Sequence, residues 1–168
     1  MKLVVANGMG RAYVSFSKEI IMKTILVPVD FSDTTTPVLA EAEVLARALG
    51  CELVLLKVAE PEPDFVGFEP GPQTVRVAVA QDYRAEHVRL DDLKAVVEAN
   101  GVAVTAMHIQ GPIVEKILDQ AAEHGAAMIV MGSHGHGALY ELLVGSITQG
   151  VLKGAKCPVV VVPAAGKT

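Results

Sequence analysis

The sequence predicts a doubly wound α/β fold, in which a parallel sheet lies between two layers of helices. Short and almost wholly apolar runs, typical of strands covered on both faces, alternate along the chain with longer amphipathic segments typical of helices. Most connections between these segments are short, and a parallel sheet built this way requires right-handed crossovers. We therefore expect a five-stranded parallel sheet with helices on both faces.

The first half of the chain predicts two strands and two helices. Residues 24–29 form the first strand, and residues 37–49 form a helix that Gly50 ends. The apolar stripe of this helix comprises Leu39, Ala42, Leu45, Ala46 and Leu49. Residues 51–59 form the second strand, and a proline-rich loop precedes a long, charge-studded helix over residues 74–100. The apolar stripe of the long helix includes Val79, Val88, Leu93, Val96 and Val97.

The second half predicts the remaining three strands and two helices. In order, they are a strand over residues 102–110, a helix over 113–123, a strand over 127–131, the start of a helix over 146–152 and a strand over 158–162. We expect the strand order 3-2-1-4-5, in which the winding reverses between the first and fourth strands. Ligands of such sheets bind at that reversal, beyond the carboxyl ends of the strands, where Asp30 and Gly132 would lie side by side.

Length and composition predict one domain with a substantial core. The chain has 168 residues, 51% of them hydrophobic, and a chain of this size buries about two-thirds of its unfolded surface. Met22 directly precedes the first strand, so we assign residues 22–165 to the domain. Residues 1–21 are expected to be an extension outside the fold: disordered, an artificial remnant or the product of an upstream start.

Charge and composition exclude several classes of function. A formal net charge of −5 gives no field that attracts nucleic-acid phosphates. The first residues contain no long uninterrupted apolar stretch followed by a cleavage site, so we expect no secretory signal, and no run of about 20 apolar residues predicts a membrane span. The two cysteines, Cys51 and Cys157, form no C-x-x-C pair and are interpreted as buried thiols in a reducing compartment. We expect a soluble, cytoplasmic protein that binds neither nucleic acid nor membranes.

A glycine-rich segment follows the fourth predicted strand. Gly132, Gly135 and Gly137 allow a ligand to approach main-chain N–H groups, which favours an anion cradle. Gly145 and Ser146, at the start of the next helix, add unpaired amides, a hydroxyl and the positive end of the helix dipole. The spacing predicts a site that a di- or triphosphate could bridge. The alternative is that these glycines only form turns.

The same segment is not a Walker A loop. No Lys-Ser/Thr pair follows the glycines, and the first lysine after them is Lys153. Developing charge would have to be met by amides and by a Mg²⁺ ion, so the sequence favours binding over turnover, and we assign no catalytic residue. A metal site of the protein's own is not expected, because the histidines lack suitably spaced partners.

Three segments resemble the universal stress protein family, in its ATP-binding branch. They are KTILVPVDFSD, GPIVEKILDQAAEHGAAMIVMGSHGHG and LLVGSITQGVLKGAKCPVVVVP, and the resemblance covers residues 23–163. It implies a Rossmann-like or flavodoxin-like single domain. It also implies a homodimer that binds ATP, or sometimes ADP or AMP, with or without Mg²⁺, in each subunit, and a role in stress response or nucleotide-linked signalling.

The resemblance also implies roles for individual residues. The walls of the adenine pocket would be Pro28, Val29 and Val58. Asp30 resembles the family's ribose-binding carboxylate, although a carboxylate at this position could simply cap the following helix. Met131 and Gly132 would contact ribose or adenine. Phosphate-binding positions are matched by Gly135, Gly145, Ser146 and Ile147, with Ser133, His134 and Thr148 beside them.

The final predicted strand suggests how the protein assembles. From Pro158 to Val162 it carries valines on both faces, so in a monomer it would be an exposed apolar edge. Pairing with a second copy removes that edge, which agrees with the homodimer that the resemblance implies. The alternative is that residues 1–21 cover it. For the function, the alternative to a nucleotide-binding regulatory module is a slow Mg²⁺-dependent ATPase or phosphotransferase at the same site.

Overall fold

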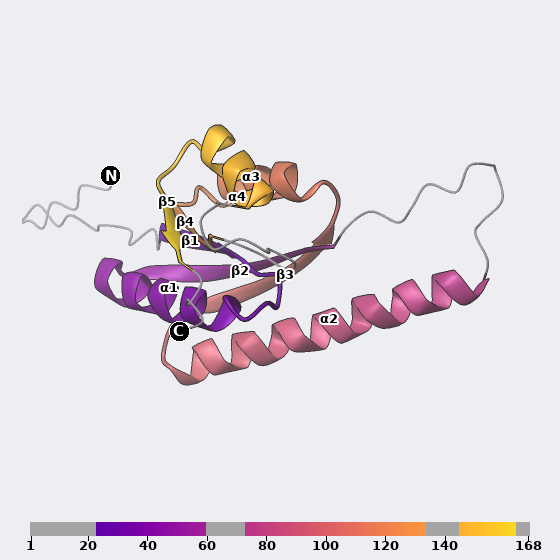
Figure 1. The fold of residues 1–168 in the computed structure, drawn as a ribbon. Helices are drawn as coiled ribbons and strands as arrows, with labels where there is room; N and C mark the ends of the chain where they lie inside the picture. Colours follow the sequence, from indigo (N-terminus) through magenta and orange to yellow (C-terminus); the bar gives the residue numbers. More distant parts are fainter. Residues whose placement is uncertain (1–22, 60–72, 134–144, 164–168) are drawn as a thin grey trace, which may run out of the picture.

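The sheet has the predicted architecture. The computed structural model describes residues 23–59, 73–133 and 145–163, with residues 73–80 as backbone only. The elements are β1 (Lys23–Pro28), α1 (Thr35–Leu49), β2 (Cys51–Ala59), α2 (Gln73–Ala99), β3 (Val104–Gln110), α3 (Ile113–Glu123), β4 (Met128–Gly132), α4 (Ser146–Gly154) and β5 (Val159–Val162) (Figure 1). All strand pairs are parallel, in the order β3-β2-β1-β4-β5, so the predicted fold class and strand order are confirmed. The predicted extension, residues 1–21, and the predicted domain end at 165 lie outside the described ranges.

The element boundaries differ from the prediction by about one turn at most. The clearest case is β3, which begins two residues later than expected. The Val102 N–H donates back to the Val97 carbonyl, at 3.3 Å, and so belongs to the turn that closes α2. The Ala103 carbonyl then accepts from the Leu53 N–H, at 2.9 Å, where the chain joins the sheet.

Two helical layers bury both faces of the sheet. Helices α1 and α2 cover one face, and α3 and α4 cover the other (Figure 1). Successive residues of β1 alternate between the two cores: Ile25 and Val27 pack towards α1 and α2, and Leu26 packs towards α3 and α4. All three are fully buried. This two-sided burial explains why the strands read as continuous apolar runs.

The contact face of α2 differs from the predicted stripe. Leu90 and Val97 are 1% and 0% exposed, and Leu93 packs partly against the same core. These three positions follow the i, i+3, i+7 spacing of one helical face. Val88 and Val96 had been predicted to face the core, but they are 60% and 57% exposed. Val96 precedes Val97 by one residue, and Val88 precedes Leu90 by two. Because successive residues are rotated by about 100° around the helix axis, both valines point away from the core. Val79 lies outside the side chains that the structure describes.

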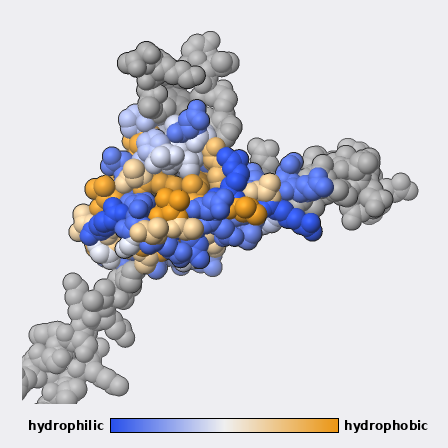
Figure 2. Space-filling view, turned by 90° about the horizontal axis from the view of Figure 1, so that it is seen from below, coloured by the Kyte–Doolittle hydropathy of each residue, from blue (hydrophilic) through white to orange (hydrophobic). Residues whose placement is uncertain are grey.

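Apolar side chains also reach the outer surface of the α1 and α2 layer. Figure 2 views the molecule from this side and shows hydrophobic atoms gathered among hydrophilic ones. Val44 and Leu49 of α1 are 58% and 55% exposed. Leu49 had been predicted to lie in the inner stripe of α1, but it occupies the last turn, next to the left-handed Gly50 that ends the helix. Within the described ranges, no helix combines the length and apolar character needed to cross a membrane.

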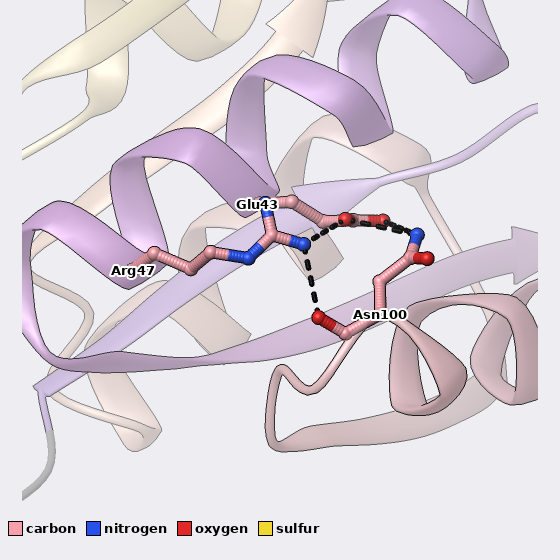
Figure 3. A network of polar contacts seen from close by, with 3 residues as sticks. All are labelled: Glu43, Arg47 and Asn100. Carbon is pink, nitrogen blue, oxygen red and sulfur yellow. Dashed lines mark hydrogen bonds and ion pairs between the residues drawn. The ribbon is translucent and has the colours of Figure 1, made fainter.

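A buried carboxylate joins α1 to the end of α2 (Figure 3). The two carboxylate oxygens of Glu43 each accept a hydrogen bond from Asn100 Nδ2, at 3.1 Å. The Arg47 guanidinium lies 2.6 Å from Glu43 Oε2 and donates to the Asn100 carbonyl at 3.1 Å. Glu43 is only 7% exposed, so this network holds the C-terminal end of α2 against α1 in a poorly solvated setting.

Replacing this carboxylate should destabilise the protein. We expect Glu43→Ala to lower the free energy of unfolding by about 0.5–1.5 kcal/mol, because it removes the acceptor that holds Asn100, at the end of α2, against α1, while Arg47 and Asn100 themselves remain accessible to water. Urea denaturation measures the change. The matched control is Glu41→Ala, an exposed position in the same helix, which should change stability by less than about 0.5 kcal/mol. Equal effects in the two variants would show that the network contributes nothing to stability.

Candidate functional site

A cavity of about 800 Å³ opens at the carboxyl edge of the sheet. Residues from the ends of β1, β2 and β4 and from the start of α4 line it. The residues singled out from the sequence that line this cavity are Pro28, Val29, Asp30, Val58, Met131, Gly132, Gly145, Ser146, Ile147 and Thr148. The cavity thus lies where the winding reverses between β1 and β4, as expected for a ligand site of this fold.

Asp30 organises the turn that follows β1. Its Oδ1 accepts hydrogen bonds from the Ser32 N–H at 3.0 Å, the Ser32 hydroxyl at 2.7 Å and the Thr35 hydroxyl at 3.4 Å. Phe31, between them, has a φ of 60°, in the left-handed region that few residues other than glycine adopt. Asp30 therefore shapes the turn before α1 while it also lines the cavity. It does not cap the helix, because the N-cap residue is Thr34, which makes no side-chain cap hydrogen bond.

The start of α4 forms the opposite wall. Gly145, its N-cap residue, makes no side-chain cap hydrogen bond, and Gly145, Ser146 and Ile147 all line the cavity. The first amides of a helix lack partners within the helix and carry the positive end of its dipole. This wall can therefore receive an anionic group.

Two hydrogen bonds align α4 with the end of β4. The Thr148 hydroxyl donates to the Gly132 carbonyl at 2.9 Å, and Thr148 is only 3% exposed. The Gly145 N–H donates to the Ser133 carbonyl at 2.8 Å, and the Ser133 N–H donates to the Val162 carbonyl at 2.8 Å. Ser133 had been expected beside the phosphate positions, but it does not line the cavity and its backbone bridges β5 and α4.

Part of the predicted phosphate site lies outside the residues that the structure describes. The residues concerned are His134, Gly135, His136 and Gly137. Their assignment as parts of the site remains a prediction from the sequence.

Sequence reasoning missed the α2 side of the cavity. Phe31, Lys57, Glu86 and Arg89 also line it. Lys57 Nζ lies 2.8 Å from Glu86 Oε1, and the Arg89 guanidinium lies 4.4 Å from the centroid of the Phe31 ring and donates to the Phe31 carbonyl at 3.2 Å. The sequence assigned no cationic side chain to the site, whereas Lys57 and Arg89 lie on the lining of the cavity. The position of Lys57 near the end of a strand, directly before Val58, was the available signal.

The described side chains show no metal centre. Among them, no group of three or more His, Cys, Asp or Glu residues is placed to hold a metal ion. Cys51 is a buried free thiol, as expected, whereas Cys157 is only half-buried.

Comparison with known proteins identifies clear relatives. The universal stress protein family matches residues 22–163. The universal stress protein in the QAH/OAS sulfhydrylase 3' region of Thermus aquaticus is 36% identical over 143 residues, which cover 83% of this chain and 98% of that protein. The structure of MJ0577 from Methanocaldococcus jannaschii has 29% identity and a TM-score of 0.72, and the match covers 86% of this chain and 98% of that one.

A more distant structure shares the fold. The universal stress protein from Archaeoglobus fulgidus in complex with dAMP is 20% identical, with a TM-score of 0.55, over 84% of this chain and 98% of that chain.

The hydroxyl of Thr148 should stabilise the connection between β4 and α4. We expect Thr148→Val, which removes the hydroxyl but keeps the shape, to lower the free energy of unfolding by about 1 kcal/mol, because the Gly132 carbonyl loses a buried donor. Urea denaturation measures this. Thr36→Val, at an exposed position of α1, is the control and should have little effect. A stability equal to that of the unmodified protein would contradict the interpretation.

Proposed function

The chain belongs to the universal stress protein family, and we propose that it binds an adenine nucleotide, ATP, as a regulatory module in a cytoplasmic stress response. The observation that carries the proposal is the convergence of Asp30, Gly132 and the start of α4 on one cavity. These residues come from distant parts of the chain and supply the chemical groups that the three parts of a nucleotide require.

Each part of a nucleotide has a chemically matched wall. Val58 and Met131 offer apolar surface to a base, and the carboxylate of Asp30 can accept hydrogen bonds from ribose hydroxyls. The first turn of α4, which begins at Ser146, suits a phosphate, since helix N-termini bind anions. The volume of about 800 Å³ lies within the usual range for small-molecule sites. The Archaeoglobus fulgidus protein was solved with dAMP, which makes adenine nucleotides the first class to test.

Removing the charge of Asp30 should weaken nucleotide binding. Asp30→Asn keeps an oxygen that can accept from Ser32 and Thr35, so the turn is preserved while the carboxylate is lost. We expect about tenfold weaker binding of ATP in the presence of Mg²⁺, measured by isothermal titration calorimetry.

The matched control for this variant is Asp33→Asn. Asp33 is exposed and does not line the cavity, so its replacement should leave the affinity unchanged. Equal losses in both variants would remove the assigned role of Asp30. If the unmodified protein shows no heat of binding with ATP, ADP or AMP, the proposed function is wrong.

A slow Mg²⁺-dependent ATPase or phosphotransferase at the same site is the second candidate. The observation that favours it is the pair of cations, Lys57 and Arg89, which could stabilise developing negative charge. Release of phosphate from saturating ATP separates the two. Turnover below about one per minute, far under the usual enzyme range, supports binding alone. Faster release that Ser146→Ala abolishes supports the enzyme.

We also propose that the protein forms a homodimer through β5. This strand is paired on one side, with β4, in the part of the chain that the structure describes. Its other edge can pair with β5 of a second copy, and three of its four valines are only half-buried in the single chain. The strand begins at Val159 rather than at Pro158, although the Pro158 carbonyl accepts from the Ile129 N–H at 3.0 Å.

A charge on this edge should favour the monomer. We expect Val161→Lys to shift the molar mass measured by light scattering from that of a dimer to that of a monomer, since a lysine on an edge strand opposes strand pairing. Val44→Lys, on the exposed surface of α1, should leave the dimer intact. A monomeric unmodified protein, or equal effects of both changes, would contradict the assignment.

A further inference from the structure

A buried imidazole lies beneath α2, close to the cavity. The side chain of His108, in β3, is only 1% exposed. The ring of Tyr83 stacks on it, with 3.9 Å between the ring centroids and an angle of 9° between the planes. The Tyr83 hydroxyl donates to the His108 carbonyl at 3.1 Å, so α2 closes over the edge strand at this position.

One carboxylate faces both His108 and a cation of the cavity. Glu86 Oε1 lies 2.8 Å from Lys57 Nζ, and Glu86 Oε2 lies 3.2 Å from His108 Nε2. The second pair is at ion-pair distance but is not aligned as a hydrogen bond, and His108 Nδ1 has no hydrogen-bond partner among the described residues. Glu86 is therefore engaged by Lys57 and is within reach of His108.

The surroundings of His108 favour its neutral form. Burial lowers the pKa of His108 below its ordinary value of 6.5, and the charges of Lys57 and His87 act in the same direction, while Glu86 opposes them. Among the described side chains, the titratable groups that face the ring are Tyr83, Glu86 and His87 from α2 and Lys57 from β2. With His108 neutral, Lys57 is the ion-pair partner of Glu86 within this group.

We propose that Lys57 is a ligand-binding residue whose ammonium group moves from Glu86 to an anionic group of the bound nucleotide, and that His108 then takes up a proton and pairs with Glu86. The inference rests on the proposed function, because it needs an anion in the cavity. Lys57 lines that cavity, and its flexible four-carbon stem permits the change. The proton comes from solvent and binds at a ring nitrogen; no other bond forms or breaks.

The direction of the pH effect follows from linkage. The bound state holds one more proton than the free state, so a lower pH favours binding. By reciprocity, a protonated His108 draws Glu86 away from Lys57 and frees the ammonium group for the ligand. Nucleotide affinity should therefore increase as the pH falls through the range in which His108 titrates.

The first experiment needs no nucleotide. NMR titration of the histidine side chains follows His108 in the unmodified protein and in Lys57→Met. We expect Lys57→Met to raise the pKa of His108, because it removes a nearby positive charge and releases Glu86. Glu86→Gln should lower it, because the stabilising carboxylate is lost. If Lys57→Met leaves the pKa of His108 unchanged, Lys57 and His108 do not share Glu86 as a partner, and the inference is wrong.

The second experiment measures ATP affinity by calorimetry between about pH 8 and about pH 6, where histidine changes charge. The phosphates of ATP also titrate in this range, so the comparison is between proteins at each pH. We expect affinity to rise about fivefold more in the unmodified protein than in His108→Gln, and Lys57→Met to bind more weakly throughout. His124→Gln, at the C-terminal end of α3 and outside the cavity lining, is the control and should behave like the unmodified protein. If His108→Gln does not fold, Glu86→Gln takes its place, because it removes the same coupling.

The outcomes separate the two proposals. Absence of ATP binding at every pH would overturn the proposed function. It would also overturn the proposed movement of the Lys57 ammonium group from Glu86 to the nucleotide. Normal ATP binding with the same pH dependence in His108→Gln and the unmodified protein would overturn the proton coupling alone. Unchanged affinity in Lys57→Met would exclude Lys57 as a ligand-binding residue.

Discussion

The reversal of winding between β1 and β4 is the constraint on which the rest of the structure depends. Both strands pair in parallel, yet α1, the helix after β1, covers one face of the sheet and α4, the helix after β4, covers the other. A cavity opens at the carboxyl edge, where residues from the ends of both strands and from the starts of both helices line it. Burial of both sheet faces fixes the positions of all the strands, so the walls of this cavity are supported by the main core.

Polar contacts then set the detail of the cavity walls. Asp30 organises the turn after β1 through Ser32 and Thr35, and the Thr148 hydroxyl ties the start of α4 to the end of β4. The remaining wall differs in kind, because it combines ion pairs and cation–π contacts that α2 contributes from far along the chain. The cavity therefore has two walls held by side-chain hydrogen bonds at the ends of β1 and β4 and one that depends on the docking of α2.

The sequence predicted the features that depend on local pattern. Strands buried on both faces are continuous apolar runs, so the sheet and its order followed from the alternation of elements, and the glycine and serine at 145 and 146 correctly marked the start of α4. The inner face of α2 was less predictable, because its valines lie on several sides of the helix, and of the side chains described there Leu90, Leu93 and Val97 meet the core. The nearness of Arg89 to the cavity arises only from the docking of α2, which no local pattern records.

The Glu43 network attaches the C-terminal end of α2 to the rest of the fold. The helix is clamped at its C-terminal end by Asn100, and its N-terminal end extends past the sheet (Figure 1). Glu86 and Arg89 lie between the clamp and the free end. Tyr83 on His108, Glu86 on Lys57 and Leu90 in the core hold the middle of the helix on the sheet as well. The projecting part of α2 is therefore continuous, through one unbroken helix, with the side chains that border the cavity.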